Sequence, residues 1–426
     1  MKKTLLPYQE AGVRFLSARY HALIADEPGL GKTLQAIGAV EVLGLKNVLV
    51  VAPASVRLNW TAEIEACLGS SYGWQVISYQ GASSPAILRH VLPQYDAIIL
   101  DEVHFVKTPS SQRCQAIFGN EKGLARRARY IWGLSGTPIL NRPVELWPML
   151  KSLHPAFASM SYTAYTQKYC AAFFDGRGVN VKGASRLDEL SSLLQGFMLR
   201  RTKAEVLPEL PPKRISRVPL EITPQEFKAV MAEEELIGAR ESKLSSVYED
   251  FSALGDMSRL LRLTGEAKVR AASEFIDDLL GTTDKVVVFA KHREVIRELE
   301  RRLALRGHTS SVYHGGMSDA QKAEAVRVFQ SETSQVFIGQ IAAAGTGING
   351  LQGVCNHVVF AELSWVPGEV GQAVDRLHRI GQTRDSVNVY MLHVPGTLES
   401  AVLGVHDAKS LVIERLMQDD VLQGLL

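Results

Sequence analysis

Short apolar runs alternate with helical patterns along two separate stretches of the chain. In the first stretch, from residue 22 to about 150, the runs are Ala22–Ala25, Val48–Ala52, Ala97–Leu100 and Tyr130–Leu134. The alternation returns near residue 285, with Val286–Phe289, Val336–Ile338, Val358–Ala361 and Val387–Met391. Such alternation is typical of parallel sheets with helices on both faces. The sequence therefore predicts an α/β fold with two parallel-sheet lobes of ordinary domain size.

The stretch between the two lobes has a different character, with helical patterns and no comparable series of β-branched runs. We expect a first lobe over residues 1–150, helical insertions and an inter-lobe linker over 151–280, a second lobe over 281–396, and a helical tail over 397–426. A proline cluster marks the connector, because proline interrupts regular structure; it comprises Pro208, Pro211 and Pro212.

Composition limits the class of protein. The chain has 46% hydrophobic and 22% charged residues, as in a soluble globular protein, and a net charge of only +2. A net charge this small gives no indication of nucleic-acid binding. A local DNA-binding groove, however, needs only a few basic side chains. The four cysteines lie far apart in sequence, which argues against a zinc ribbon or a disulfide framework.

Targeting signals are not evident in the sequence. The start of the chain lacks the apolar core of a signal peptide, and no apolar stretch reaches 18 residues. We therefore expect an intracellular protein with no membrane partner, cytoplasmic if bacterial or phage and nuclear if eukaryotic.

The segment Asp26–Thr33 reads Asp-Glu-Pro-Gly-Leu-Gly-Lys-Thr and carries the clearest chemistry. Gly29 and Gly31 allow backbone N–H groups to close around phosphate oxygens. Lys32 supplies a charge for the β- and γ-phosphates, and the Thr33 hydroxyl can hold Mg²⁺. Asp26 stands where the general phosphate loop, G-x-x-x-x-G-K-[ST], has its first glycine.

Two acidic residues follow the buried run Ala97–Leu100. Asp101 is the candidate Mg²⁺ ligand, and Glu102 is the candidate general base that polarises an attacking water. His104 is either a residue that couples the site to other surfaces or an ordinary packed histidine.

Small hydroxyl side chains follow the next apolar run. Ser135 and Thr137, in Ser-Gly-Thr-Pro, are candidates for sensing the γ-phosphate, although this segment alone would be an ordinary Gly-Pro turn.

Two arginines far along the chain complete the candidate site. If the segment Gln372–Gln382 is helical, Gln372, Arg376 and Arg379 share one stripe. Arginines brought from a second lobe can neutralise charge on a transferred phosphoryl group. The alternative is a surface helix with solvated arginines.

With these motifs, the chain resembles a superfamily-two helicase-type ATPase of the SWI/SNF-related double-stranded-DNA translocase branch, and it looks most like the annealing-helicase group. The resemblance covers nearly the whole chain, in the expected order. Besides the segments above, it rests on Leu6–Gln9, Val51–Trp60, Phe197–Lys203, Leu207–Lys213, Tyr313–Met317, Ala344–Gly347 and Phe360–Trp365. It implies two RecA-like lobes, with ATP and Mg²⁺ as cofactors.

The resemblance also implies roles for particular residues. Gln9 would read adenine, and the other ATP contacts would be Asp26, Gly29, Gly31, Lys32, Thr33 and Gln372. Phosphates of double-stranded or forked DNA would meet Ser55, Asn59, Trp60, Lys291, His292, His314 and Thr346. The implied activity is DNA-stimulated ATP hydrolysis by a monomer that moves along a duplex and remodels or anneals DNA or displaces bound protein.

Two alternatives remain open. A strand-separating DNA or RNA helicase shares the catalytic residues, and only the Phe197–Lys213 and Phe360–Gln382 segments oppose it. An ATP-dependent clamp that binds DNA without turnover is opposed by the presence of Lys32, both acids and both arginines.

Overall fold

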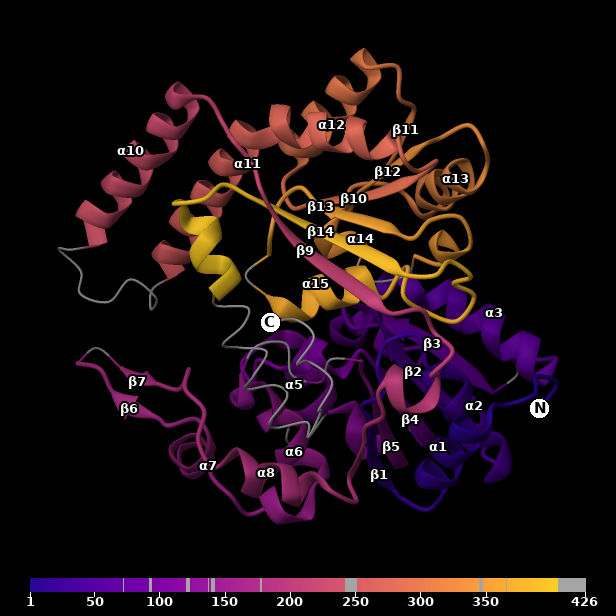
Figure 1. Ribbon diagram of the computed structural model, residues 1–426. Coiled ribbons are helices and arrows are strands. Elements are labelled where there is room, and N and C mark those ends of the chain that lie inside the picture. The colour runs from indigo at the N-terminus through magenta and orange to yellow at the C-terminus, as the bar shows by residue number, and fades with distance from the viewer. Residues whose placement is uncertain are drawn as a thin grey trace. The chain divides into compact units, whose positions relative to one another are not determined.

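The computed structural model describes residues 1–71, 73–91, 94–119, 123–136, 138, 142–176, 178–241, 251–344, 348–364 and 366–404 (Figure 1). The chain divides into two compact units, which meet in the sequence between Glu209 and Leu210. Among the described residues, no helix is both long enough and apolar enough to cross a bilayer.

The first unit contains a six-stranded parallel sheet with the order β3-β2-β4-β5-β1-β8. Its strands are β1 (His21–Ile24), β2 (Val48–Ala52), β3 (Trp74–Ser78), β4 (Tyr95–Asp101), β5 (Ala128–Leu134) and β8 (Met198–Leu199). Strand β1, which leads into Asp26–Thr33, lies between β5 and β8. A separate antiparallel hairpin is formed by β6 (Phe173–Phe174) and β7 (Val179–Asn180).

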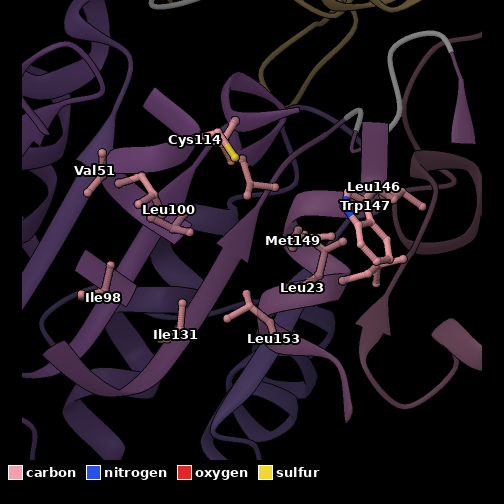
Figure 2. Close-up of a cluster of buried hydrophobic side chains, with 14 of the residues drawn as sticks. Leu23, Val51, Ile98, Leu100, Cys114, Ile131, Leu146, Trp147, Met149 and Leu153 are labelled. Atoms are coloured by element: carbon pink, nitrogen blue, oxygen red, sulfur yellow. The ribbon is translucent and has the colours of Figure 1, made fainter. Parts of the chain in front are cut away.

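Helices cover the first sheet because its strands are apolar on both sides. The helices are α1 (Pro7–Ser17), α2 (Lys32–Val42), α3 (Arg57–Leu68), α4 (Pro85–Leu88), α5 (Gln112–Phe118), α6 (Trp147–Leu153), α7 (Tyr162–Tyr169), α8 (Leu187–Leu194) and α9 (Lys203–Val206). One apolar cluster contains Ile24 and Trp132, and a second contains Leu23, Ile131 and Trp147 (Figure 2). Alternate residues of β1 and β5 thus serve two cores, as the period of two in a strand requires.

The second unit contains another six-stranded parallel sheet, with the order β11-β12-β10-β13-β14-β9. Its strands are β9 (Lys213–Pro219), β10 (Val286–Ala290), β11 (Ser310–Tyr313), β12 (Val336–Gln340), β13 (His357–Phe360) and β14 (Val387–His393). The helices are α10 (Pro224–Glu241), α11 (Phe251–Leu280), α12 (Arg293–Leu305), α13 (Asp319–Gln330), α14 (Ile341–Ala344) and α15 (Pro367–Val374). The predicted α/β class with two parallel-sheet lobes is confirmed.

All eight predicted strands are present, but the apolar runs did not reveal β3, β8, β9 and β11. All four lie at sheet edges, where one side of a strand remains open to polar residues. Strand β9, for example, exposes Lys213, Arg214 and Arg217. Most of the predicted helical tail lies outside the described residues, which end at residue 404.

Candidate functional site

The candidate ATP-site residues of the first unit follow the carboxyl ends of three strands. Asp26–Thr33 follows β1, Asp101 ends β4, and Ser135 follows β5. These strands are neighbours in one parallel sheet, so their carboxyl ends share one edge. Ligands of open α/β sheets bind at this edge.

The phosphate loop has the backbone that its glycines predict. Gly29 and Gly31 adopt φ angles of 91° and 74°, in the left-handed region that favours glycine. A Cβ at Gly31 would also lie 2.4 Å from Nε2 of Gln9. Helix α2 begins directly afterwards at Lys32, so the loop opens onto a helix N-terminus, which favours anions.

Lys32 lies against the loop that it is expected to serve. Its Nζ donates to the backbone oxygens of Asp26 at 2.7 Å and Glu27 at 3.2 Å. Burial lowers the pKa of Lys32, while Glu102, Asp26 and Asp101 offset part of this change. Phosphate oxygens would give this partly desolvated ammonium stronger acceptors than the two carbonyls, because charge-assisted hydrogen bonds are stronger than neutral ones.

The Asp26 side chain is bound inside the first unit, and its predicted contact with ATP stays a prediction. It is fully buried, and its two carboxylate oxygens accept hydrogen bonds from Nε and Nη2 of Arg201, the first at 3.0 Å. Nε2 of Gln35 donates to the same carboxylate at 3.0 Å. These contacts hold the first residue of the phosphate loop to Arg201 and Gln35.

Two arginines whose roles the motifs do not predict, Arg200 and Arg201, contact the loop and the residues beside it. Nη1 of Arg200 donates to the backbone oxygens of Ala25 at 2.6 Å and Gly136 at 3.1 Å. Arg201 binds Asp26 and also donates to the oxygen of Gln35 at 2.9 Å. Both belong to Phe197–Lys203, a segment that carries the family resemblance. They reach the loop because β8 pairs with β1.

Gln9 supports the loop from α1. Its Nε2 donates to the backbone oxygen of Leu30 at 3.3 Å, and its Oε1 accepts from the N–H of Leu6 at 3.0 Å. The side chain is 3% exposed. Its amide thus bonds to the phosphate loop in this structure, and its predicted contact with adenine stays a prediction.

Trp60 is buried rather than exposed, and its predicted contact with DNA stays a prediction. Its side chain is 2% exposed, and Nε1 donates to Oδ2 of Asp101 at 2.7 Å. The Tyr79 hydroxyl donates to the backbone oxygen of Asp101 at 2.8 Å. Both aromatic residues hold the end of β4 in place.

The Asp101 carboxyl fits a cation ligand. Burial and the neighbouring Glu102 raise the pKa of Asp101 to about 7, although Trp60 and Lys32 act in the opposite direction. A divalent cation would relieve this cost of burying the negative charge. Among the described residues, no group of three or more His, Cys, Asp and Glu side chains is arranged to hold a metal. Mg²⁺ at Asp101 and Thr33 would therefore take further ligands from phosphates and water.

Glu102, His104 and Ser135 form one polar cluster. His104 Nδ1 lies 3.1 Å from Ser135 Oγ, and the Ser135 hydroxyl also lies 3.3 Å from Oε2 of Glu102. Burial lowers the pKa of His104 to about 3, so the ring is neutral near pH 7. Glu102 has a left-handed φ of 50°, which is strained for a residue other than glycine. Thr137 lies outside the described residues.

The arginine segment of the second unit is not a continuous helix. Helix α15 contains the buried Gln372 but ends at Val374, so the helical stripe does not extend to Arg376 and Arg379. The backbone turns instead, with the N–H of Leu377 bound to the oxygen of Val374 and that of Gln382 to the oxygen of Arg379. The Gln382 amide donates to the backbone oxygens of Cys355 and Leu377 and fixes this turn.

The turn still places the two arginines on one short segment. Nη1 of Arg376 donates to the backbone oxygen of Ile348 at 3.3 Å, and Nη1 of Arg379 donates to Oδ1 of Asn349 at 2.7 Å. Burial and the nearby Arg376 lower the pKa of Arg379 to about 10, although Asp375 opposes this. Two guanidinium groups held close together favour an anionic ligand.

The candidate DNA-binding residues differ in their accessibility. Asn59 is exposed on α3 and Ser55 is partly exposed before it, whereas Thr346 lies outside the described residues. In the second unit, Lys291 and His292 follow β10. Glu362 accepts the backbone N–H groups of both residues at 2.8 Å and lies 2.6 Å from the His292 ring. The His292 ring is thus already engaged.

His314, which follows β11, lies among cations. Its Nδ1 accepts a hydrogen bond from Nη2 of Arg293 at 3.0 Å. Burial and the charges of Arg293, Arg297 and Lys322 lower its pKa. Together with Lys291, these residues give the carboxyl edge of the second sheet a positive patch that suits phosphates.

Comparisons with known proteins identify the family. The SNF2-related domain matches residues 8–95 and 75–262, and the helicase conserved C-terminal domain matches residues 267–381. The chain therefore belongs to the SNF2-related family, as its motifs had indicated.

Individual relatives agree with this assignment. The human DNA annealing helicase and endonuclease ZRANB3 is 32% identical over 443 residues, covering 97% of this chain and 40% of the relative. The SWI/SNF-related matrix-associated actin-dependent regulator of chromatin subfamily A-like protein 1 of Xenopus tropicalis is 35% identical over 419 residues, covering 93% and 43%. The chain thus spans about two-fifths of the length of these curated relatives.

Among solved structures, the Sulfolobus solfataricus SWI2/SNF2 ATPase core in complex with dsDNA aligns with a TM-score of 0.45 at 24% identity. The alignment covers 100% of this chain and 96% of that one.

Proposed function

We propose that this chain is a DNA-stimulated ATPase that moves along double-stranded DNA and thereby remodels or anneals DNA structures or displaces bound protein. The observation that carries the proposal is the arrangement at the carboxyl edge of the first sheet, where the phosphate loop, Lys32, Asp101 and Glu102 lie on neighbouring strands. Family membership and the similarity to ZRANB3, a DNA annealing helicase and endonuclease, support the choice of DNA.

ATP is the proposed substrate of this edge. The backbone N–H groups around Gly29 and Gly31 would bind phosphate oxygens, and Lys32 would exchange its two carbonyl acceptors for the β- and γ-phosphates. Mg²⁺ held by Thr33 and Asp101 would neutralise phosphate charge. Glu102 would orient and polarise the attacking water, while His104 and Ser135 would hold its carboxylate.

Arg376 and Arg379 would complete the site from the second unit by neutralising charge on the transferred phosphoryl group. Hydrolysis would then require the two units to close around ATP. Each cycle of closure and opening would move the DNA contacts of the first unit, at Ser55 and Asn59, relative to those of the second, at Lys291 and His314. These contacts would be to phosphates, and so independent of sequence and sensitive to salt.

The test is the rate of ATP hydrolysis with duplex DNA, forked DNA, single-stranded DNA and RNA, each at two salt concentrations. We expect stimulation by duplex and forked DNA that weakens as salt rises. Stimulation by single strands or RNA, with little by duplex, would instead identify a strand-separating helicase. DNA binding without turnover would identify a clamp. An annealing assay with complementary strands then tests the proposed outcome of translocation.

A further inference from the structure

The segment from Arg201 to Pro211, here called the strap, is bound at its first end to the phosphate loop. The Arg201 guanidinium grips the fully buried carboxylate of Asp26 through Nε and Nη2. The backbone N–H of Glu27 donates to the oxygen of Arg201 at 3.0 Å, and the N–H of Lys203 donates to Oε2 of Glu27 at 2.5 Å. The strap thus holds the two residues whose carbonyl oxygens accept from Lys32.

The other end of the strap is bound to the arginine turn of the second unit. Nε2 of His378 lies 2.9 Å from the backbone oxygen of Pro211, and since a carbonyl only accepts, the ring must donate. His378 is 6% exposed and stands between Arg376 and Arg379. The next residue, Pro212, accepts the N–H of Val387 at 3.0 Å, where β9 joins β14.

Between its two ends the strap contains a short capped helix and two prolines. Thr202 and Glu205 form a capping box around α9, with the Thr202 N–H bound to Oε2 of Glu205 at 2.6 Å. Leu207 is 5% exposed, so this part of the strap is packed. Pro208 and Pro211 fix two backbone φ angles near its end. A short, capped and proline-containing segment transmits displacement better than a flexible linker does.

We infer that Arg201 and His378 are positioning residues, and that the strap between them couples the position of the arginine turn to the position of Lys32. This inference rests on the proposed function. A displacement of the turn pulls on Pro211 through His378, and the strap passes it to Asp26 through Arg201. Lys32 follows, because its ammonium is bound to the Asp26 carbonyl. The loop and the arginines then respond to each other through the strap and its hydrogen bonds, by a path that does not pass through ATP.

The decisive experiment lengthens the strap without touching its ends. The probe is a Gly-Ser-Gly-Ser insertion between Glu209 and Leu210, and the matched control is the same insertion after Gly176, in the exposed β6–β7 turn. We expect the strap insertion to lower the duplex-stimulated kcat about tenfold or more while KM for ATP changes little, because binding and closure become uncoupled. The control should hydrolyse ATP like the unmodified chain. Equal rates for the two insertions would overturn the inference.

Side-chain variants test the two ends separately. His378→Leu removes the donor to Pro211 and should lower stimulated kcat, whereas His378→Gln offers an amide donor and should restore much of it. Arg201→Lys keeps the charge but loses the two-pronged contact with Asp26, and it should lower kcat with the melting temperature nearly preserved. Parallel losses of melting temperature and of all activity would show a merely structural role. An unmodified chain without DNA-stimulated hydrolysis would instead defeat the proposed function itself.

Discussion

The indole N–H of Trp60 donates to Oδ2 of Asp101 at 2.7 Å, from a side chain that is only 2% exposed. This bond favours the charged form of Asp101, against burial and Glu102, which together raise the pKa of the carboxyl to about 7. Trp60, a candidate DNA contact, thus supports the carboxylate of the proposed Mg²⁺ ligand. The segments that contain Trp60 and Asp101 are thus connected by a hydrogen bond inside the first unit.

Trp60→Phe keeps the aromatic packing and removes this hydrogen bond. The pKa of Asp101 should rise further, so a proton competes better with Mg²⁺. We expect the half-saturating Mg²⁺ concentration for ATP hydrolysis near pH 7 to rise about three- to tenfold. A hydrogen bond to a charged group contributes about 1.5–3 kcal/mol, and solvent replaces part of that contribution. The control is Trp132→Phe, whose buried indole donates to the Arg19 carbonyl. Equal Mg²⁺ dependence in both variants would contradict the assignment.

Lys32→Ala should remove most ATP hydrolysis. The ammonium donates to two loop carbonyls, and the β- and γ-phosphates would lose their counter-charge. The measurement is steady-state phosphate release with saturating duplex DNA, and Lys46→Ala, at an exposed position, serves as the control. Turnover at the unmodified rate would show that the ATP site lies elsewhere.

Arg379→Ala should leave ATP binding nearly intact and lower kcat by about 10³ or more, because the charge acts on the transition state. Binding is measured with a fluorescent ATP analogue and turnover by phosphate release. Arg384→Ala, at an exposed arginine five residues later, should change neither. Loss of binding in Arg379→Ala would instead mean that the residue, through its bond to Asn349, serves the structure of the turn.

His104 should make the first unit sensitive to acid. Its pKa is about 3 in the folded chain, against an ordinary value of 6.5, so the unfolded chain binds more protons between these values. Stability therefore falls as pH drops through this window, by about 2 kcal/mol between about pH 7.5 and pH 5 for this group. His104→Gln should reduce that loss in urea unfolding, whereas His90→Gln, at an exposed histidine, should not. An unchanged pH dependence in His104→Gln would contradict the buried, neutral ring.

Lys291→Ala should weaken duplex binding for every DNA sequence alike. If Lys291 neutralises one phosphate, the slope of log Kd against log salt should decrease by about one. Anisotropy titrations with two unrelated duplexes at several salt concentrations measure it. Arg214→Ala provides the control, since Arg214 lies at the amino end of β9, on the opposite edge of the second sheet. An unchanged slope would remove Lys291 from the DNA surface.

Some of the residues that hold the phosphate loop are predictable from the sequence, and others are not. The glycines, Lys32 and the adjacent acids were found because each follows a strongly apolar strand, and such strands are visible as local patterns. Arg200 and Arg201 were present in a recognised signature but received no role. Their contacts with Ala25 and Asp26 span 175 residues, and only the pairing of β8 with β1 brings them there.

The sequence by itself determined the two parallel sheets, the phosphate loop and the acids at the end of β4, because these depend on local apolar runs and local backbone requirements. Tertiary structure alone decided the direction in which single side chains face. It turned Trp60 inward to Asp101 and Asp26 toward Arg201, and it ended α15 before Arg376. Those outcomes depend on buried partners distant in sequence, since an inward polar group needs a hydrogen-bond partner that no local pattern reveals.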